Sequence, residues 1–209
     1  MKQFQTKQEN FWAGEFGDDY INRNSGRDMV ANNIALFSKI INATDGSIKS
    51  ILELGANIGL NLLALKRLLP DVEISALEIN DKAVIELKNN IGEDSKIYHQ
   101  SILDFKTDYQ RDFVLIKGVL IHINPDILGE VYKILYESSK KYICIMEYYN
   151  PTPVSIPYRG HDGFLFKRDF AGEMLDLYSS LKLIDYGFVY HRDNNFKQDD
   201  GTWFLLSKI

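Results

Sequence analysis

The chain has 209 residues, of which 45% are hydrophobic and 25% are charged, values that are ordinary for a single globular domain spanning 1–209. Its net charge of −5 and the lack of a Lys/Arg run argue against a nucleic-acid partner. No apolar run is long enough to cross a bilayer, so we expect no membrane partner. Cys144 is the single cysteine, so no internal disulfide is possible. Since the first residues also lack a signal-peptide core, we expect a cytoplasmic protein.

Residues 1–27 are polar but contain an unusual group of aromatic residues: Phe11, Trp12, Phe16 and Tyr20. We interpret this segment as a lid or cap. The alternative is an N-terminal helix that packs on the edge of a sheet. Asp28 is expected to cap the next helix, because apolar residues follow it at helical spacing.

The segment Ile51–Gly59 combines a short apolar strand with a glycine turn, and it leads into a helix expected over Leu60–Leu69, before Pro70. A strand that enters a helix through glycines is typical of nucleotide-binding α/β sheets. A dinucleotide fingerprint requires glycine at three positions, and two of these hold Asn57 and Leu60. An NAD or nucleotide-sugar enzyme on a similar fold therefore remains only an alternative.

The residues from Glu53 to Gly59 read acid-x-Gly-x-Asn-x-Gly. This pattern resembles motif I of the class I S-adenosylmethionine-dependent methyltransferases, in which Asn is a common substitute for the middle glycine. Asn tolerates left-handed backbone better than most residues, so it can preserve the turn. The resemblance implies that Glu53, Gly55, Asn57 and Gly59 contact S-adenosylmethionine, with S-adenosylhomocysteine as the product. The alternative role for Glu53 is a capping or helix-dipole partner.

The second strand, Val72–Leu77, ends at Glu78, and a helix is expected to begin at Asn80 or Asp81. A carboxylate at this strand end can accept hydrogen bonds from both ribose hydroxyls of an adenosine cofactor. We therefore assign Glu78 and the adjacent Ile79 to the cofactor site. The alternative for Glu78 is a solvated acid. In similar methyltransferases the segment after the third strand frames adenine, which implies a cofactor role for Ser101 and Ile102.

The fourth strand, Phe113–Ile116, is continuously apolar, as expected of a strand covered on both faces. The residues after it are Lys117, Gly118 and Val119, and the resemblance places them beside the sulfonium of the cofactor. His122 lies just beyond. It is a candidate base for the acceptor's proton, and capping of the next helix is the alternative.

After the fifth strand, Tyr142–Met146, residues 150–167 contain three prolines, and we expect an irregular substrate-side loop there. His161 is a second catalytic candidate in this loop, and Arg159 is a candidate to bind a phosphate or carboxylate of the acceptor. Asp169 is expected to cap the last helix. Two closing strand patterns predict an antiparallel hairpin on a mostly parallel, doubly wound, seven-stranded α/β sheet of the Rossmann-like methyltransferase type.

The run Trp-x-Gly-Glu-Phe-Gly-x-x-Tyr-x-x-Arg-Asn, which begins at Trp12, adds to the resemblance, as does Lys-Gly-Val-Leu-Ile-His-Ile-Asn-Pro, which begins at Lys117. Together with motif I they are similar to the bacterial methyltransferases associated with pseudaminic acid biosynthesis. This resemblance implies a small-molecule acceptor, a sugar or sugar nucleotide of surface-glycan biosynthesis. Tyr20 and Arg23 are then expected near the carboxylate of the cofactor. A non-catalytic binding or scaffolding protein is the other alternative, and the scattered histidines predict no metal site.

Overall fold

The computed structural model describes residues 4–23 and 26–209. Two short helices, α1 (Lys7–Ala13) and α2 (Glu15–Arg23), precede the long helix α3 (Arg27–Asn42). Next come β1 (Ser50–Leu54), α4 (Leu60–Leu68), β2 (Glu73–Glu78), α5 (Asp81–Ile91) and β3 (Lys96–His99). A short 3₁₀ helix, η1 (Ile102–Asp104), leads into β4 (Arg111–Lys117). The expected alternation of strands and helices is therefore present.

The second half begins with two 3₁₀ helices, η2 (Leu120–His122) and η3 (Pro125–Ile127), followed by α6 (Leu128–Ser138) and β5 (Ser139–Glu147). The chain then forms β6 (Val154–Tyr158), β7 (His161–Lys167) and α7 (Phe170–Leu177). It closes with β8 (Leu181–Val189) and β9 (Gly201–Lys208). The side chain of Asp169 accepts a hydrogen bond from the Gly172 amide at the start of α7, which confirms the predicted cap.

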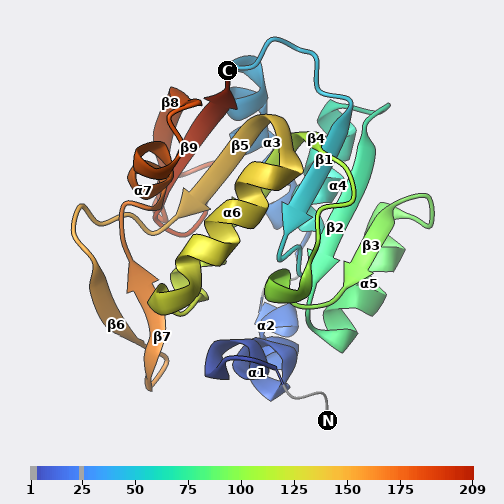
Figure 1. The fold of residues 1–209 in the computed structure, drawn as a ribbon. Coiled ribbons are helices and arrows are strands. Elements are labelled where there is room, and N and C mark those ends of the chain that lie inside the picture. The colour runs from blue at the N-terminus through green and yellow to red at the C-terminus, as the bar shows by residue number, and fades with distance from the viewer. Residues whose placement is uncertain (1–3, 24–25) are drawn as a thin grey trace.

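One seven-stranded sheet has the order β3-β2-β1-β4-β5-β9-β8. The first five strands are parallel, and β9 pairs antiparallel with both β5 and β8. Figure 1 shows α6 on one face of the sheet and α3 and α4 on the other. Side chains alternate between these two cores, so that Phe113 and Leu115 of β4 join the α3–α4 core while Val114 and Ile116 join the α6–α7 core. The predicted doubly wound sheet with a terminal hairpin is confirmed.

Two local predictions are wrong. The residue that caps α3 is Gly26, whereas Asp28 lies in the first turn, where its charge complements the positive end of the helix dipole. Residues 154–167 are a β-hairpin instead of an irregular loop. Arg159 and Gly160, both at positive φ (50° and 86°), form its two-residue turn. Pro157 falls where the β6–β7 register shifts, so its missing N–H disrupts no ladder bond.

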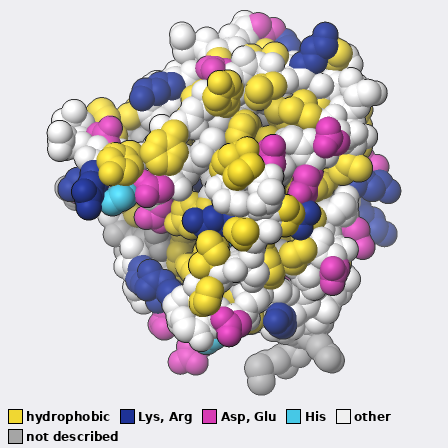
Figure 2. Space-filling model, turned by 90° about the vertical axis from the view of Figure 1, so that its left-hand side faces the viewer, with side chains coloured by type: hydrophobic (Ala, Val, Ile, Leu, Met, Phe, Trp, Pro, Cys, Tyr) yellow, Lys and Arg dark blue, Asp and Glu magenta, His cyan; other side chains and the backbone are white. Residues whose placement is uncertain are grey.

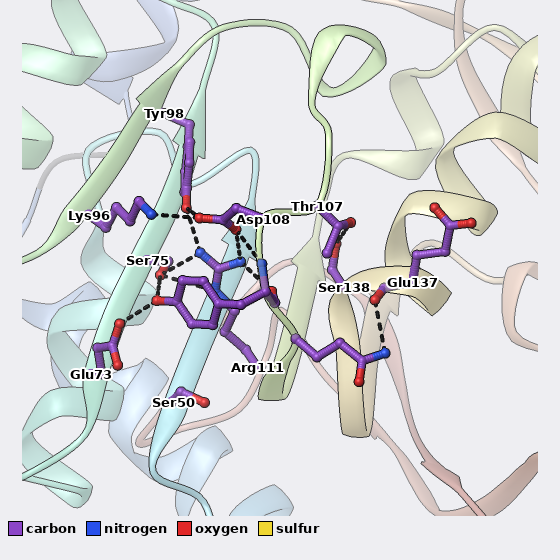
Figure 3. A network of polar contacts seen from close by, with 12 residues as sticks. Ser50, Glu73, Ser75, Lys96, Tyr98, Thr107, Asp108, Arg111, Glu137 and Ser138 are labelled. Atoms are coloured by element: carbon purple, nitrogen blue, oxygen red, sulfur yellow. Dashed lines mark hydrogen bonds and ion pairs between the residues drawn. The ribbon is translucent and has the colours of Figure 1, made fainter.

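A buried arginine ties β2, β3 and β4 together near the start of β4 (Figure 3). The Arg111 side chain is fully buried, and its Nη1 lies 2.5 Å from Asp108 Oδ1. Its other guanidinium nitrogens donate to Ser75 Oγ and to the Tyr98 hydroxyl, and the Tyr109 ring packs 3.6 Å from Cζ. The charge is therefore paired and hydrogen-bonded, which offsets the cost of its burial.

The edge strand β8 leaves several apolar side chains exposed, and Figure 2 shows hydrophobic and charged side chains interspersed on this side of the molecule. The most exposed large hydrophobic residues of β8 are Tyr186 and Phe188, at 64% and 60%. In the described part of the chain, no helix is both long and apolar enough to cross a bilayer.

Candidate functional site

The turn between β1 and α4 has the backbone that its sequence predicts. Gly55, Asn57 and Gly59 all have positive φ, at 77°, 47° and 81°. The amides of Gly55 and Ala56 both donate to the Leu77 carbonyl at 2.9 Å, which fixes the turn to the end of β2. Asn57 thus adopts the left-handed conformation that glycine would otherwise supply.

The two glycines of this turn are required for different reasons. A Cβ on Gly55 would lie 2.6 Å from Val119 Cγ2, in the segment that follows β4. A Cβ on Gly59 would lie 2.5 Å from Leu87 Cδ1 of α5. Gly55 therefore permits close approach at the site, whereas Gly59 permits close packing of α4 against α5.

Glu78 closes the turn from the neighbouring strand. Its carboxylate is buried and accepts hydrogen bonds from three backbone amides, those of Asn57 (2.7 Å), Ile79 (2.8 Å) and Asn80 (2.8 Å). Burial raises the pKa of this carboxyl, and the three N–H groups oppose the rise because they favour the charged form. Glu78 is thus a rigid acceptor that faces the cavity described below.

Glu53 is completely buried beneath the same turn. Its Oε1 accepts a hydrogen bond from Asn61 Nδ2 at 2.6 Å, and its Oε2 has no hydrogen-bond partner among the described residues. Burial raises the pKa of Glu53 to about 8, and the Lys117 ammonium opposes that rise. Because Asn61 donates to Glu53, its side-chain carbonyl remains available to a ligand.

The segment after β3 is bonded to the N-terminal helices. Ser101 donates its hydroxyl hydrogen to Glu9, whose other carboxylate oxygen accepts from the amide and hydroxyl of Thr6 in a capping box. The Ser101 oxygen in turn accepts from the Leu103 amide at 3.1 Å. Ser101 and Ile102 form one wall of the cavity together with Glu9, a residue that the sequence analysis did not select.

Glu147, at the end of β5, supports the segment after β4. Its carboxylate accepts from the amides of Val119 and Leu120 at 2.9 Å and of Ile121 at 3.4 Å. Burial raises its pKa to about 7, although these three donors favour the charged form. Gly118, at φ 67°, lies in open space beside the cavity, as a close approach to a ligand requires.

His122 is buried at the cavity wall. Its Nδ1 lies 2.6 Å from the Phe164 carbonyl, so Nδ1 carries the hydrogen and Nε2 is the ring's free acceptor. Burial lowers its pKa to about 4, which keeps the imidazole neutral at pH 7. The ring centroid lies 4.6 Å from that of Trp12 and 4.8 Å from that of Tyr158.

We call α1 and α2 the lid, because they lie across the carboxyl ends of the strands (Figure 1). Lid aromatic rings pack on the β6–β7 hairpin: the Phe11 and Phe164 centroids are 4.3 Å apart, and those of Phe16 and Tyr158 are 5.7 Å apart. Gln8 Nε2 also donates to the Gly163 carbonyl at 3.0 Å. The lid and the β6–β7 hairpin, which the sequence analysis treated separately, therefore form one wall of the site.

The loop between β8 and β9, residues 190–200, also lines the site. Asn32 of α3 donates to the Lys197 carbonyl at 2.6 Å, and Gln198 donates to the Asn32 carbonyl at 3.0 Å. The Tyr148 hydroxyl donates to Asp199 Oδ2 at 3.2 Å. The sequence analysis selected no residue of this loop.

These segments enclose a cavity of about 720 Å³ at the carboxyl edge of the sheet. Most of the predicted site residues line it: Tyr20, Arg23, Gly55, Asn57, Glu78, Ile79, Ser101, Ile102, Lys117, Gly118, Val119 and His122. Glu53 and Gly59 lie behind this lining. His161 is exposed on β7, with its ring 5.1 Å from that of Phe11, and does not join the other candidates.

Polar lining residues that the sequence analysis missed come from segments with no motif: Gln8, Asn33, Asn61, Tyr148 and Asp199. Two buried polar atoms of the lid, Gln8 Oε1 and Trp12 Nε1, have no hydrogen-bond partner within the described chain. In residues 4–23 and 26–209, no group of three or more His, Cys, Asp or Glu side chains is arranged to hold a metal ion.

The strand order, the glycine turn and the cavity together define the class I methyltransferase fold. No protein-family model and no curated protein sequence matches the chain. Among solved structures, the 1,6-didemethyltoxoflavin-N1-methyltransferase of Burkholderia thailandensis, with its named substrate and S-adenosylhomocysteine bound, has a TM-score of 0.72 and 12% identity, covering 100% of this chain and 93% of that one.

Two further structures share the fold. Magnesium protoporphyrin IX methyltransferase from Synechocystis PCC 6803, with S-adenosylhomocysteine bound, has a TM-score of 0.68 and 12% identity, covering 96% of this chain and 98% of that one. The plantazolicin methyltransferase BpumL, in complex with a pentazolic analogue and S-adenosylhomocysteine, has a TM-score of 0.65 and 13% identity. The match covers 92% of this chain and 89% of that one. At these identities the likeness establishes the fold, and the named substrates differ widely.

Proposed function

We propose that this chain is an S-adenosylmethionine-dependent methyltransferase that acts on a small polar acceptor. The main observation is the left-handed Gly55–Gly59 turn, which lies beside Glu78 at the edge of the cavity. Similar structures crystallised with S-adenosylmethionine or S-adenosylhomocysteine support the cofactor. When bound, the cofactor supplies a sulfonium methyl group that is already activated for in-line displacement.

The residues of the cavity fit such a cofactor in distinct ways. Glu78, fixed by three amides, is placed to accept hydrogen bonds from ribose hydroxyls. Ser101 and Ile102 would frame the adenine, and Gly118 and Val119 would lie along the thioether side. The carbonyl of Asn61, held by Glu53, would face the amino group of the methionine part, with Tyr20 and Arg23 near its carboxylate.

We further propose a sugar or sugar nucleotide as the acceptor, in surface-glycan biosynthesis of the pseudaminic acid type. The sequence resemblance at the lid and at Lys117 supports this proposal. The aromatic side chains of Trp12 and Tyr158 line the cavity together with Arg23 and Arg159. Such rings can pack on the apolar face of a sugar, and guanidinium groups suit a phosphate or carboxylate.

The protein's part in catalysis would be mainly alignment. The lid and the β6–β7 hairpin would exclude water and position the acceptor in line with the methyl group. His122, neutral and with a free Nε2, is proposed to accept a hydrogen bond from the acceptor. His161 does not line the cavity, so we assign it no contact with the reacting atoms.

Binding of S-adenosylhomocysteine by isothermal titration calorimetry tests the proposal. Gly55→Arg should abolish binding, because its side chain would occupy the space beside Val119. Glu78→Ala should weaken binding by at least about tenfold, since a hydrogen bond to a charged group contributes about 1.5–3 kcal/mol.

Two matched variants control for folding. Gly46→Arg changes another glycine at positive φ, in open space and away from the cavity, and Glu86→Ala removes an exposed carboxylate of α5. Both should bind like the wild type. Unchanged affinity in Gly55→Arg and Glu78→Ala would refute the site. NAD binding without S-adenosylhomocysteine binding would favour the dinucleotide alternative, and cofactor binding without turnover would favour a scaffold.

A further inference from the structure

Methylation of a hydroxyl or amino group releases a proton, so a carboxylate free to accept one has a clear use in this cavity. Four carboxylate residues line the cavity in the described chain: Glu9, Glu78, Glu147 and Asp199. Three of them already accept hydrogen bonds at both carboxylate oxygens. Glu78 and Glu147 each accept from three backbone amides, and Glu9 is bound by Thr6 and Ser101.

A proton taken up at one of these oxygens would have to compete with a donor that is already bonded to it. Asp199 is different, because within the described residues its side chain accepts a single hydrogen bond, the 3.2 Å bond from the Tyr148 hydroxyl. One of its two oxygens therefore remains free. Its side chain is also exposed at the cavity, so a proton taken up there can pass to solvent between turnovers.

Asp199 is positioned by contacts outside its own loop. The adjacent residues Lys197 and Gln198 are bonded to Asn32 of α3, and Tyr148 directly follows β5. Both ends of the loop lie at the carboxyl edge of the sheet, because β8 runs parallel to β5 and β9 returns between them. Asp199 consequently lies at the carboxyl ends of β5 and β8, on the edge of the sheet that carries the cavity.

Several charged or titratable groups face Asp199. From other elements these are Tyr20 of the lid, Lys117 at the end of β4, and Tyr148. Tyr158 of β6, Arg23 and Glu147 lie near the same tyrosines. On its own loop, His191 pairs with Asp200 at 2.8 Å instead of with Asp199.

We propose that Asp199, held by Tyr148, is the catalytic base that removes the acceptor's proton. The inference rests on the proposed methyltransferase function and adds the acceptor class, a sugar nucleotide or acidic sugar that reacts through an amino or hydroxyl group. The acceptor's oxygen or nitrogen bonds to the methyl carbon while the carbon–sulfur bond breaks and sulfur keeps that electron pair. The acceptor's proton moves to Asp199 Oδ1 and its bonding pair stays on the acceptor atom.

The test measures transfer of labelled methyl from S-adenosylmethionine to three probes, UDP-glucosamine, UDP-N-acetylglucosamine and N-acetylneuraminate, as a function of pH. We expect Asp199→Asn to lower kcat/KM at pH 7 by about 10²–10⁴-fold and to remove the acid limb of the pH profile. Affinity for S-adenosylhomocysteine should remain within about twofold of the wild type. The reactive probe should also bind the S-adenosylhomocysteine complex of Asp199→Asn more weakly.

Asp200→Asn is the matched control, because Asp200 is the next residue, pairs with His191 and does not line the cavity. It should retain the wild-type rate and pH profile, and Asp199→Glu should recover part of the rate. An unchanged rate and acid limb in Asp199→Asn would overturn the inference. Loss of the acid limb in His122→Asn but not in Asp199→Asn would also overturn it. The same holds if the wild-type protein binds S-adenosylhomocysteine but methylates none of the three probes. Failure of the wild type to bind S-adenosylhomocysteine would instead overturn the proposed function.

Discussion

Glu53 shows how burial alone changes the chemistry of a motif residue. In sequence it is one acid before a glycine turn. In the structure it has no solvent exposure, one hydrogen bond from Asn61 and one oxygen without a partner. Burial raises its pKa to about 8, so a substantial fraction of the protein carries a neutral Glu53 at pH 7.

The stability of the protein should therefore depend on pH through Glu53. A carboxyl whose pKa is raised on folding, from 4.5 to about 8, stabilises the folded state fully below pH 4.5, and this contribution is lost as the pH rises toward 8. Glu53→Gln cannot ionise but retains the acceptor for Asn61. Relative to the wild type, its free energy of unfolding should rise between pH 5 and pH 8.5 by at least about 1.4 kcal/mol, the equivalent of one pKa unit.

Urea denaturation at pH 5, 7 and 8.5 measures this difference, with Glu86→Gln as the control because Glu86 is an exposed carboxylate. The control should show no trend with pH. A constant difference between Glu53→Gln and the wild type across this range would mean that Glu53 remains charged after folding.

Among the elements, the lid is joined to α5 by Asn80, the residue that caps that helix. Asn80 caps α5 with its side-chain oxygen, which accepts from the Ala83 amide at 2.9 Å. Its side-chain nitrogen donates to the Trp12 carbonyl at 3.2 Å and to Asp18 at 2.9 Å, both in the lid. A single amide thus joins the end of β2, the start of α5 and the lid.

Two substitutions at Asn80 should separate these roles. Asn80→Asp keeps the capping oxygen but loses both donors, and it places a second carboxylate beside Asp18. We expect faster amide hydrogen exchange over residues 7–23 with little change in α5. Asn80→Ala should also lose the cap, which costs about 1–2 kcal/mol in the free energy of unfolding. If the lid of Asn80→Asp exchanged its amide hydrogens at the wild-type rates, the aromatic contacts would be sufficient to hold the lid in place.

For the whole molecule, the cavity is lined by parts of the chain that are far apart in sequence. The lid, the strand ends, the β6–β7 hairpin and the β8–β9 loop all line it. A ligand that fills it contacts every one of these parts only in the folded state. Binding should therefore stabilise the protein globally.

At 100 times its dissociation constant, S-adenosylhomocysteine should add about 2.7 kcal/mol to the free energy of unfolding. For a chain of this length that corresponds to a rise in Tm of about 5–10 °C, measurable by differential scanning calorimetry. Glu78→Ala at the same ligand concentration should show a smaller rise. Equal rises in both proteins would place the ligand away from Glu78.

Sequence alone determined the order of most elements and the backbone of the glycine turn. The strand patterns, the Asn80 and Asp169 caps and the left-handed turn at Gly55 and Asn57 depend on interactions among residues close together in the chain. Pro157 misled the interpretation of the hairpin, because a proline is compatible with a strand only where the pairing is irregular, and pairing is not a local property.

Tertiary structure decided how each polar side chain is used. Glu78 and Glu147 have no acidic neighbour in sequence and Asp199 is followed by Asp200. Folding surrounds the first two with amides, whereas Asp199 accepts a hydrogen bond from a tyrosine 51 residues away. It also placed Gly59 in a helix contact and His161 outside the cavity. Burial, hydrogen-bond partners and free lone pairs depend on which distant segments pack together, and only the folded chain specifies them.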